Sequence, residues 1–472
     1  MAHLSKDFDF LIRAHFASDP RVIRYETEYL KAGSVFSRDG RENAIEADML
    51  RVQLALSAEE GSYLRIEAFF PETWEGRFLG FGNGGMAGGL PVSSLIHHAN
   101  LHRVTCVTDL GTSRGQDSGI RNFAVARDFG HRATHLMTVY SKVLARLLYG
   151  EDPAYSYFFG GSTGGEQALS EAQRYPEDYD AISAGAPANN RIALHTYFIW
   201  NFIHTHSPDG KPLFDEALTR KIHSSAIAYA QAHGDGEKGD RFITMPYLEK
   251  DTIDAMVDFI VASLSLSDDL AFHLRALYQG PADSRGNKIY NGIPASGELY
   301  YCGISNTAQM DISPFPYPFI WVMGDKFNPF TFDFDDDFQK VSSTLSPHMD
   351  ANDPDLRPFL ERGGKLLIVS GTADPCVPFQ DAYFYSEKVQ SAVGQEKAKK
   401  GFRFFLIPSF DHGRAAGLDN ASLIDDKGVN ICDALFAWRE KGIPIDAVTA
   451  SLRGYDEADD HLRTISPLIP RL

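Results

Sequence analysis

A glycine-rich turn with a serine at its centre constrains this chain more than any other segment. The turn, Gly160-Gly161-Ser162-Thr163-Gly164-Gly165, follows the apolar run 155–159 and precedes residues 166–172, which are mostly good helix formers. A strand that turns sharply into a helix strains the residue at its apex, and small neighbours let the chain pass without a clash. This Gly-x-Ser-x-Gly pattern is typical of a nucleophile elbow and predicts acyl transfer through an ester of Ser162. The alternative is a glycine-rich turn whose serine only caps a helix.

The size and charge of the chain narrow its class. With 472 residues, 43% of them hydrophobic, it is long enough for a large α/β domain with a second domain inserted. The net charge of −18 argues against a nucleic-acid partner, because binding a phosphate backbone requires a basic surface. The sequence has no run of about 18 apolar residues, so we expect no membrane partner either.

The N-terminus and the cysteines bear on the cellular compartment. Residues 1–10 lack the apolar core of a signal peptide. The four cysteines have neither paired nor metal-like spacing and are expected to be buried free thiols: Cys106, Cys302, Cys376 and Cys432. So few cysteines favour a reducing compartment. We therefore expect a cytoplasmic protein; the alternative is a secreted protein whose signal peptide has been removed.

Alternating strand-like and helix-like segments predict the fold class. The expected helix spans 131–149, and strands are expected at 63–70, 77–81, 104–108, 155–159, 181–185, 365–370 and 403–408. Such alternation indicates an α/β protein with a mostly parallel, doubly wound sheet. Residues 190–345 lose the alternation and are rich in aromatic and turn residues. We expect an α/β-hydrolase catalytic domain from residues 1–189 and 346–472, with 190–345 inserted as a lid domain.

A serine nucleophile requires a histidine base and an acid that orients the histidine. In α/β-hydrolases the chain order is serine, acid, histidine, and the acid and the histidine lie in loops that follow strands. Asp374 follows the strand expected at 365–370, and His412 follows the strand expected at 403–408. The predicted catalytic triad is therefore Ser162, Asp374 and His412.

Other residues fit this order less well. Three histidines lie too early in the chain: His131, His135 and His195. Asp411 adjoins His412 and is interpreted as a residue that shapes the loop. Asp381 lies beyond the turn, at an expected helix start.

A second glycine-rich segment, Gly82-Asn83-Gly84-Gly85, follows the strand expected at 77–81. It resembles the oxyanion loop of esterases, in which backbone N–H groups stabilise the negative charge of the reacting carbonyl oxygen. We expect the N–H groups of Gly84, Gly85 and Thr163 to do this, and one such donor typically contributes about 3–4 kcal/mol in the transition state. The alternative is a flexible glycine turn.

Taken together, these segments resemble the tannase and feruloyl esterase family from about residue 60 to residue 440. The segments that carry the resemblance are Gly82-Asn83-Gly84-Gly85, Asp109-Leu110-Gly111-Thr112, Arg132-Ala133-Thr134-His135, residues 157–165, Gly185-Ala186-Pro187-Ala188, residues 331–335, Asp353-Pro354-Asp355-Leu356 and Gly363-Gly364-Lys365-Leu366. The resemblance implies the same triad and an activity on phenolic esters such as galloyl and feruloyl conjugates.

The chain departs from the family pattern in two places. The resemblance implies a disulfide between cysteines beside the serine and the histidine, but Gly161 and Gly413 occupy those positions. It also implies a calcium loop in the lid, where this chain has only residues 233–240, with Asp235 and Asp240 as weak ligand candidates. We expect no cofactor, and a solvated acidic turn is the alternative to calcium.

The substrate and the exact reaction stay open at this stage. The candidate pocket residues are Glu166, Trp200, Tyr301 and Trp321. Glu166 stands where relatives often have a basic residue, and it would discourage acidic substrates if it faced the site. Aromatic side chains in the insertion suit an aryl or polyketide-like ester, although they also suit the insertion's own core.

The leading hypothesis is a serine carboxylic-ester hydrolase that acts on a small-molecule ester. The alternatives are an acyltransferase or lactonase of specialised metabolism that uses the same acyl-enzyme, and a non-catalytic binding protein on a retired hydrolase fold. The sequence does not indicate an oligomeric state.

Overall fold

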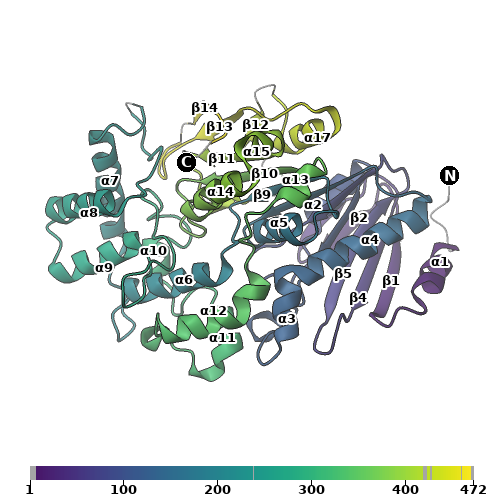
Figure 1. Ribbon diagram of the computed structural model, residues 1–472, viewed down its shortest axis with the longest axis horizontal. Coiled ribbons are helices and arrows are strands. Elements are labelled where there is room, and N and C mark those ends of the chain that lie inside the picture. Colours follow the sequence, from purple (N-terminus) through teal and green to yellow (C-terminus); the bar gives the residue numbers. More distant parts are fainter. Residues whose placement is uncertain (1–6, 238, 418–422, 426–427, 459, 469–472) are drawn as a thin grey trace.

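A nine-stranded sheet forms the centre of the protein, with strand order β1-β4-β5-β7-β6-β8-β9-β10-β11 (Figure 1). The computed structural model describes residues 7–237, 239–417, 423–425, 428–458 and 460–468. The strands of this sheet are β1 Val22–Leu30, β4 Met49–Leu56, β5 Leu64–Pro71, β6 Arg77–Phe81, β7 Val104–Thr108, β8 Tyr155–Gly161, β9 Ala181–Gly185, β10 Lys365–Gly371 and β11 Phe402–Ile407.

The sheet is mostly parallel, as predicted. Strands β7, β6, β8, β9, β10 and β11 pair in parallel, whereas β1, β4 and β5 extend the sheet in antiparallel fashion. All the predicted strands are present with ends within two residues of the expected ones. Strands β1 and β4 were not predicted. Strand β1 lies at the edge of the sheet, and most of its side chains are exposed or half-buried, so its sequence lacks the apolar run of a buried strand.

Helices cover both faces of the sheet. Helices α2 (Ser93–Asn100) and α17 (Ile431–Lys441) pack on one face, and the other face carries α4 (Ala133–Tyr149), α5 (Thr163–Arg174) and α14 (Gln380–Val393). The strands supply both cores because their side chains alternate between faces. In β8, Tyr157 contacts Phe436 of α17, whereas Phe158 contacts Tyr179 on the opposite side.

Between the neighbouring strands β9 and β10 the chain leaves the sheet and forms a group of helices beside it (Figure 1). These helices are α6 Arg191–Thr205, α7 Glu216–Ala232, α8 Lys250–Leu264, α9 Asp268–Gln279, α10 Ile304–Thr307, α11 Tyr317–Met323, α12 Asp336–Met349 and α13 Arg357–Glu361. The predicted lid, residues 190–345, falls within this stretch. Its status as a separate domain stays a prediction.

The two ends of the helical insertion are hydrogen-bonded to each other. The Ala351 N–H donates to the Asn189 carbonyl at 2.8 Å, and the Asn189 side chain donates to Asn352 Oδ1 at 2.7 Å. The Asn352 side chain in turn donates to Asn190 Oδ1 at 3.1 Å. We call residues 189–190 and 351–352 the base of the insertion. Helix α6 starts directly after this base, so the base fixes where α6 enters the site.

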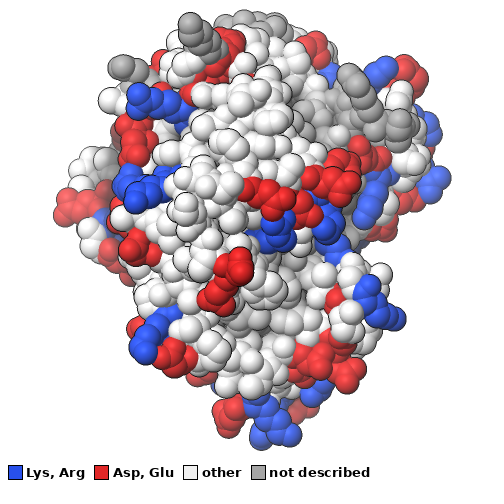
Figure 2. All heavy atoms as spheres, turned by 90° about the vertical axis from the view of Figure 1, so that its left-hand side faces the viewer, with Lys and Arg blue, Asp and Glu red and all other residues white. Residues whose placement is uncertain are grey.

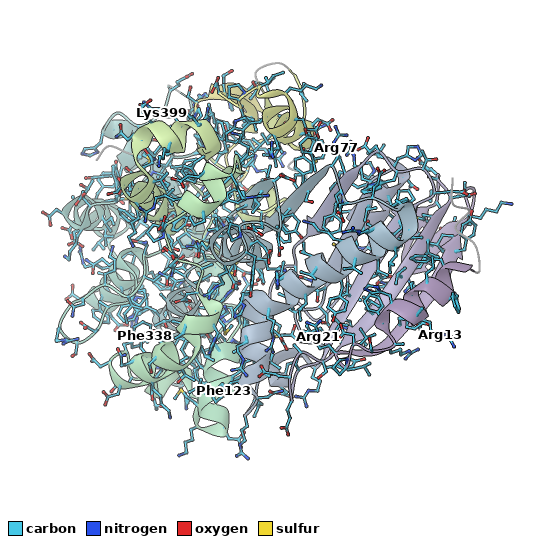
Figure 3. All side chains as sticks on the ribbon, turned by 45° about the vertical axis from the view of Figure 1, so that its right-hand side comes forward. Arg13, Arg21, Arg77, Phe123, Phe338 and Lys399 are labelled. Carbon is cyan, nitrogen blue, oxygen red and sulfur yellow. The ribbon has the colours of Figure 1, made fainter. Side chains whose placement is uncertain are left out.

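Smaller elements complete the structure. They are helix α1 Asp7–Phe16, α3 Phe123–Arg127, α15 Gln395–Gly401, α16 His412–Ala415, the hairpin β2 Val35–Arg38 and β3 Arg41–Ala44, and the small sheet of β12 Leu423–Asp425, β13 Val448–Leu452 and β14 His461–Ile465. Arg77 of β6, labelled in Figure 3, binds Glu440 of α17 through two hydrogen bonds of 2.7 and 2.9 Å. This contact ties the C-terminal part of the chain to the central sheet.

The surface of the helical insertion carries acidic and basic side chains interspersed among uncharged ones (Figure 2). The net negative charge is therefore not gathered into one patch on this face. Among the residues that the structure describes, no helix combines the length and hydropathy needed to span a membrane.

Candidate active site

The predicted elbow has the geometry that its sequence implies. Strand β8 ends at Gly161, helix α5 begins at Thr163, and Ser162 between them has φ 60° and ψ −118°, a conformation that non-glycine residues rarely adopt. The Ser162 N–H donates to the Gly185 carbonyl at 2.8 Å, and its own carbonyl accepts from the Ala188 N–H at 3.1 Å. These bonds fix the strained backbone and leave the Ser162 side chain half-exposed.

Glycine is required at position 161 because a second segment of the chain lies against it. A Cβ atom there would lie 1.8 Å from the carbonyl oxygen of Ala416, just after helix α16. At Gly413 the nearest atom to such a Cβ lies 3.9 Å away. The cysteine expected at position 161 from the family resemblance does not fit this packing, so the two loops meet by backbone contact instead of a disulfide.

Asp374 and His412 lie after the neighbouring strands β10 and β11 and bind each other. Asp374 Oδ2 is 2.8 Å from His412 Nδ1, and Oδ1 accepts from the N–H groups of Cys376 and Val377 at 2.8 and 2.9 Å. The Asp374 side chain is fully buried. Because a carboxylate only accepts hydrogen bonds, the proton lies on His412 Nδ1, and Nε2 keeps a lone pair in the neutral ring.

The surroundings of His412 favour a charged imidazole. Burial by itself lowers the pKa of His412, but the combined effects of the adjacent Asp374 carboxylate and of Cys376 hold that pKa well above its ordinary value. The side chain is still 15% exposed, so the cavity reaches it. Asp411 does not share the role of Asp374: its side chain accepts from the Arg414 N–H and caps helix α16, as the sequence analysis expected of a loop-shaping residue.

The glycine-rich loop after β6 packs against the elbow. The Gly164 N–H donates to the Asn83 carbonyl at 2.7 Å, and the Asn83 N–H donates to Gln167 Oε1 at 2.8 Å. No described residue accepts a hydrogen bond from the N–H of Gly84, Gly85 or Thr163, the three predicted oxyanion donors. Gly84, Gly85 and Thr163 all line the cavity that Ser162 lines.

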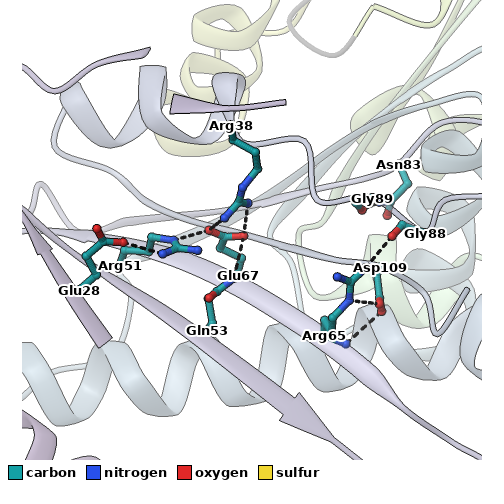
Figure 4. Close-up of polar contacts among 10 residues, drawn as sticks. All are labelled: Glu28, Arg38, Arg51, Gln53, Arg65, Glu67, Asn83, Gly88, Gly89 and Asp109. Carbon is teal, nitrogen blue, oxygen red and sulfur yellow. Dashed lines mark hydrogen bonds and ion pairs between the residues drawn. The ribbon is translucent and has the colours of Figure 1, made fainter. Parts of the chain in front are cut away.

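A buried carboxylate supports this loop from the side (Figure 4). Asp109, in the Asp-Leu-Gly-Thr segment, accepts from the Arg65 N–H at 3.0 Å and from Arg65 Nε at 2.7 Å. Arg65 also donates to the Gly88 carbonyl at 2.6 Å, and the Thr112 hydroxyl donates to the Met86 carbonyl at 2.6 Å. The segment that the sequence analysis used only as a family signature therefore supports the glycine-rich loop.

An arginine from the insertion is linked through the elbow to the glycine-rich loop after β6. Arg191, at the start of α6, donates through Nη1 to the Thr163 hydroxyl at 3.2 Å and through Nη2 to Glu166 Oε2 at 2.5 Å. The Thr163 hydroxyl donates onward to the Gly85 carbonyl. Arg191 is 3% exposed and Glu166 is fully buried. Burial raises the pKa of Glu166 to about 8 despite the opposing effect of Arg191.

These elements enclose one cavity of about 550 Å³. Its polar lining includes Ser162 and His412, and its apolar lining comes mainly from the insertion and from the loop after β10: Leu194, Phe198, Phe315 and Val377. Asp374 lies behind His412, outside the lining. The structure therefore places Ser162 and His412 in the lining of one cavity, with Asp374 bound to His412, and residues of α6 line the same cavity.

Of the four predicted substrate residues, one lines the cavity and three do not. Tyr301 lines the cavity. Glu166 does not, because it lies beneath Arg191 and does not present its charge to a substrate. Trp200 donates to the Ala276 carbonyl and Trp321 to the Gln116 carbonyl, both at sites away from this lining. The two tryptophans pack within the insertion and against its neighbours, which the sequence analysis had kept as the alternative.

The calcium candidates have protein partners. Asp235 accepts from the N–H groups of Thr244 and Met245, and Asp240 forms hydrogen bonds of 2.9 and 2.6 Å with Arg463. Within the described part of the chain, no group of three or more potential metal-ligating side chains is present. All four cysteines are buried free thiols, as predicted.

Sequence reasoning missed several residues of the cavity. Arg191 and Leu194 belong to the stretch read as a lid, and no local motif marks them. His195 was considered only as a possible base, and it too lines the cavity. The i, i+4 spacing of Arg191 and His195 puts both on one face of α6, but only the packing of α6 shows that this face meets the elbow.

The fold and the site define the class of the protein. An elbow serine after the central parallel strand β8, with an acid after β10 and a histidine after β11 on the far side of β9, is the arrangement of the α/β-hydrolases. The chain belongs to the tannase and feruloyl esterase family within that class, because the family pattern matches residues 59–465.

Individual relatives agree with this assignment. Feruloyl esterase B of Aspergillus niger is 29% identical in an alignment of 394 positions that covers 77% of this chain and 71% of the relative. A probable feruloyl esterase B-2 of Aspergillus terreus is 28% identical in an alignment of 428 positions that covers 86% of this chain and 79% of the relative.

Solved structures share the fold. Feruloyl esterase B of Aspergillus oryzae superposes with a TM-score of 0.80 at 22% identity, covering 98% of this chain and 95% of that one. Tannin acyl hydrolase of Aspergillus niger superposes with a TM-score of 0.73 at 19% identity, covering 97% and 91%. The protein is therefore a carboxylic ester hydrolase with an α/β-hydrolase fold.

Proposed function

We propose that the protein hydrolyses a phenolic or related aromatic ester through an acyl-enzyme on Ser162. The observation that carries this proposal is the Asp374–His412 hydrogen bond at 2.8 Å, which engages Nδ1 of a histidine that lines the same cavity as the elbow serine. The family names of the relatives, feruloyl esterase and tannase, support an aromatic ester as substrate. The apolar wall of Leu194, Phe198 and Phe315 suits an aromatic ring.

In the proposed acylation step, His412 Nε2 takes the proton of the Ser162 hydroxyl while Oγ attacks the ester carbonyl carbon. The carbonyl oxygen becomes an oxyanion, which accepts hydrogen bonds from the N–H groups of Gly84, Gly85 and Thr163. When the intermediate collapses, the C–O bond to the alcohol breaks, and His412 returns the proton to the leaving oxygen. The products of this step are the free alcohol and the acyl-enzyme.

In the proposed deacylation step, His412 takes a proton from water and the resulting hydroxide attacks the acyl carbon. The same N–H groups hold the second oxyanion, and Ser162 leaves with the proton from His412. Asp374 stays ionised throughout and stabilises the imidazolium that forms in both steps. The proposed reaction uses no metal and no organic cofactor.

The test is intact-mass analysis after treatment with a fluorophosphonate probe, followed by assays with methyl esters of hydroxylated aromatic acids. We expect one adduct and measurable turnover with the unchanged protein and neither with Ser162→Ala. The matched control is Ser224→Ala, which removes an exposed hydroxyl on helix α7 and should behave as the unchanged protein.

Other outcomes separate the alternatives. Absence of an adduct on the unchanged protein would contradict the proposal and favour a binding protein. If added amines or alcohols divert the acyl group, the protein is an acyltransferase, whereas turnover confined to cyclic esters would identify a lactonase.

A further inference from the structure

His195 lies in the wall of the catalytic cavity, and the proposed mechanism gives it no role. Its Nδ1 is 2.5 Å from the carbonyl oxygen of Phe315. A carbonyl oxygen only accepts hydrogen bonds, so Nδ1 carries the proton of the neutral ring and donates it to Phe315. The other ring nitrogen, Nε2, then has a lone pair and acts as an acceptor.

His195 stays neutral over the pH range in which an esterase works. The side chain is 2% exposed, and burial lowers its pKa well below the ordinary value. The positive charge of Arg191, one helical turn earlier on α6, lowers it further. The hydrogen bond to Phe315 opposes these effects without overcoming them. Position 195 therefore presents an acceptor and not a cation.

The acceptor is unused within the protein. None of the described residues donates a hydrogen bond to Nε2. The neighbouring rings are Phe198, Phe315 and Tyr317, with centroids 5.5, 6.3 and 4.7 Å from that of His195, and each lies nearly perpendicular to it. A hydrogen bond formed in such weakly polar surroundings is electrostatically stronger than one formed in water. Nε2 is therefore an acceptor that a donor group on a ligand in the cavity can use.

We propose that His195 Nε2 accepts a hydrogen bond from a hydroxyl group on the aromatic ring of the substrate, which makes His195 a specificity-determining residue. This inference rests on the proposed function and deepens it. His195 and Ser162 both line the cavity of about 550 Å³, a volume within the range of small-molecule sites. A ring without a hydroxyl, or with a methoxy group in its place, offers no donor and leaves the lone pair unmet.

The chain offers a matched pair of variants. In His195→Asn the amide nitrogen can take the place of Nδ1 and keep the bond to the Phe315 carbonyl, but nothing replaces Nε2. In His195→Gln the longer side chain brings its carbonyl oxygen near the place of Nε2 and keeps an acceptor there. Comparing the two variants separates the loss of the acceptor from a general disturbance of the packing around α6.

The experiment measures kcat/KM for the methyl ester of a hydroxylated cinnamic acid and for the methyl ether of the same ester. We expect the unchanged enzyme to prefer the free hydroxyl at least tenfold. His195→Asn should reduce the ratio to near one, and His195→Gln should retain most of it. A ratio near one in the unchanged enzyme, or an undiminished ratio in His195→Asn, overturns the inference.

Two further measurements keep the test decisive. The first is the binding of both esters to Ser162→Ala, measured by calorimetry, which requires no variant at position 195. At least tenfold tighter binding of the hydroxylated ester supports the inference, and equal binding of the two esters overturns it. Fluorophosphonate labelling of Ser162 separates the two proposals. Labelling without a hydroxyl preference rejects only the role of His195, whereas loss of both labelling and ester turnover rejects the esterase mechanism as well.

Discussion

At the scale of the residue, the site depends on where the protons of two histidines lie. His412 and His195 both donate through Nδ1, the first to a carboxylate and the second to a backbone carbonyl. The carboxylate raises the pKa of His412, whereas burial lowers that of His195. Two identical side chains on one cavity thus receive different chemical properties from their partners: in the proposed reaction, Nε2 of His412 exchanges protons, whereas Nε2 of His195 accepts a hydrogen bond.

The pH profile of the reaction should reflect the raised pKa of His412. Only neutral His412 accepts the Ser162 proton, so kcat/KM should fall as the pH drops through this pKa. The acidic limb of the profile should therefore lie above pH 6.5, the usual pKa of a histidine. In Asp374→Asn the limb should move to lower pH, because the carboxylate that raises the pKa is gone.

Asp374→Asn should also lower kcat by roughly 10²- to 10⁴-fold, because an amide favours the tautomer with its proton on Nε2. The measurement is kcat/KM from pH 5 to 9 for both proteins, with circular dichroism as the check on folding. A limb at the same pH in both would contradict the role given to Asp374.

The hydroxyl of Thr163 is expected to orient the oxyanion loop. It donates to the Gly85 carbonyl and accepts from Arg191 Nη1. Thr163→Val keeps the shape of the side chain but removes both bonds, so the Gly85 peptide loses its fixed orientation. We expect kcat to fall about tenfold, equivalent to about 1.4 kcal/mol, with KM little changed.

Thr163→Ser keeps the hydroxyl and is the control for this prediction. Steady-state kinetics and the rate of fluorophosphonate labelling should both show the difference between the serine and the valine variants. If KM rises while kcat stays constant in Thr163→Val, the hydroxyl acts in substrate binding and not in positioning the loop.

At the scale of the element, the elbow and helix α16 meet without a covalent bond. Their contact is the backbone of Ala416 against Gly161, at a separation that leaves no room for a Cβ atom. Close backbone packing at Gly161 thus holds these two loops together, and the family resemblance implies a disulfide in that role. This backbone contact positions the histidine loop relative to the elbow strand.

Gly161→Ala should separate these two elements. The added methyl group would lie 1.8 Å from the Ala416 carbonyl oxygen, so the loop that follows His412 must shift. Overpacking of this kind typically costs about 1–3 kcal/mol, and kcat should fall because His412 moves with its loop. Gly413→Ala, whose nearest neighbour is 3.9 Å away, is the matched control. Differential scanning calorimetry and ester turnover would reveal the contrast; equal behaviour of both variants would refute it.

At the scale of the whole molecule, the base of the insertion sets how the helices meet the sheet. The Asn190 side chain donates to Asp381 Oδ1 at 3.3 Å, and Asp381 Oδ2 is buried without a partner among the described residues. Burial raises the pKa of Asp381 to about 6, and that of nearby Asp350 also to about 6. Two carboxylates are thus held where ionisation is unfavourable.

This arrangement makes stability depend on pH. A carboxyl group whose pKa is higher in the folded state contributes stability below its unfolded pKa, and that contribution is lost as the pH rises from about 4 through about 6. The shift from 3.8 to about 6 corresponds to at most about 3 kcal/mol for Asp381.

Asp381→Asn, which imitates the protonated group, should raise the Tm by a few degrees at pH 7.5 and leave it nearly unchanged at pH 4.5. Thermal unfolding at both pH values tests this. A stabilisation of equal size at both would contradict the assignment to ionisation.

The sequence predicts much of this protein because several of its signals are local. Ser162, Asp374 and His412 each follow a strand, and a strand with its turn is encoded by adjacent residues. The edge strand β1 was missed because partial exposure allows polar residues that hide the usual pattern. Glu166 was a candidate for the pocket but lies outside its lining, under Arg191 of α6. The sequence of a helix start alone does not show which of its side chains another helix will cover.

Sequence alone therefore determined the enzyme class and the central parallel sheet, and it supplied the predicted order of the triad. The tertiary structure decided what surrounds them: Arg191 over Glu166, His195 in the cavity wall, and Ala416 against Gly161. These contacts join segments far apart in the chain, and they depend on how helices of the insertion and loops of the sheet pack together. Packing is a collective property of the folded chain, so no short pattern of residues encodes it.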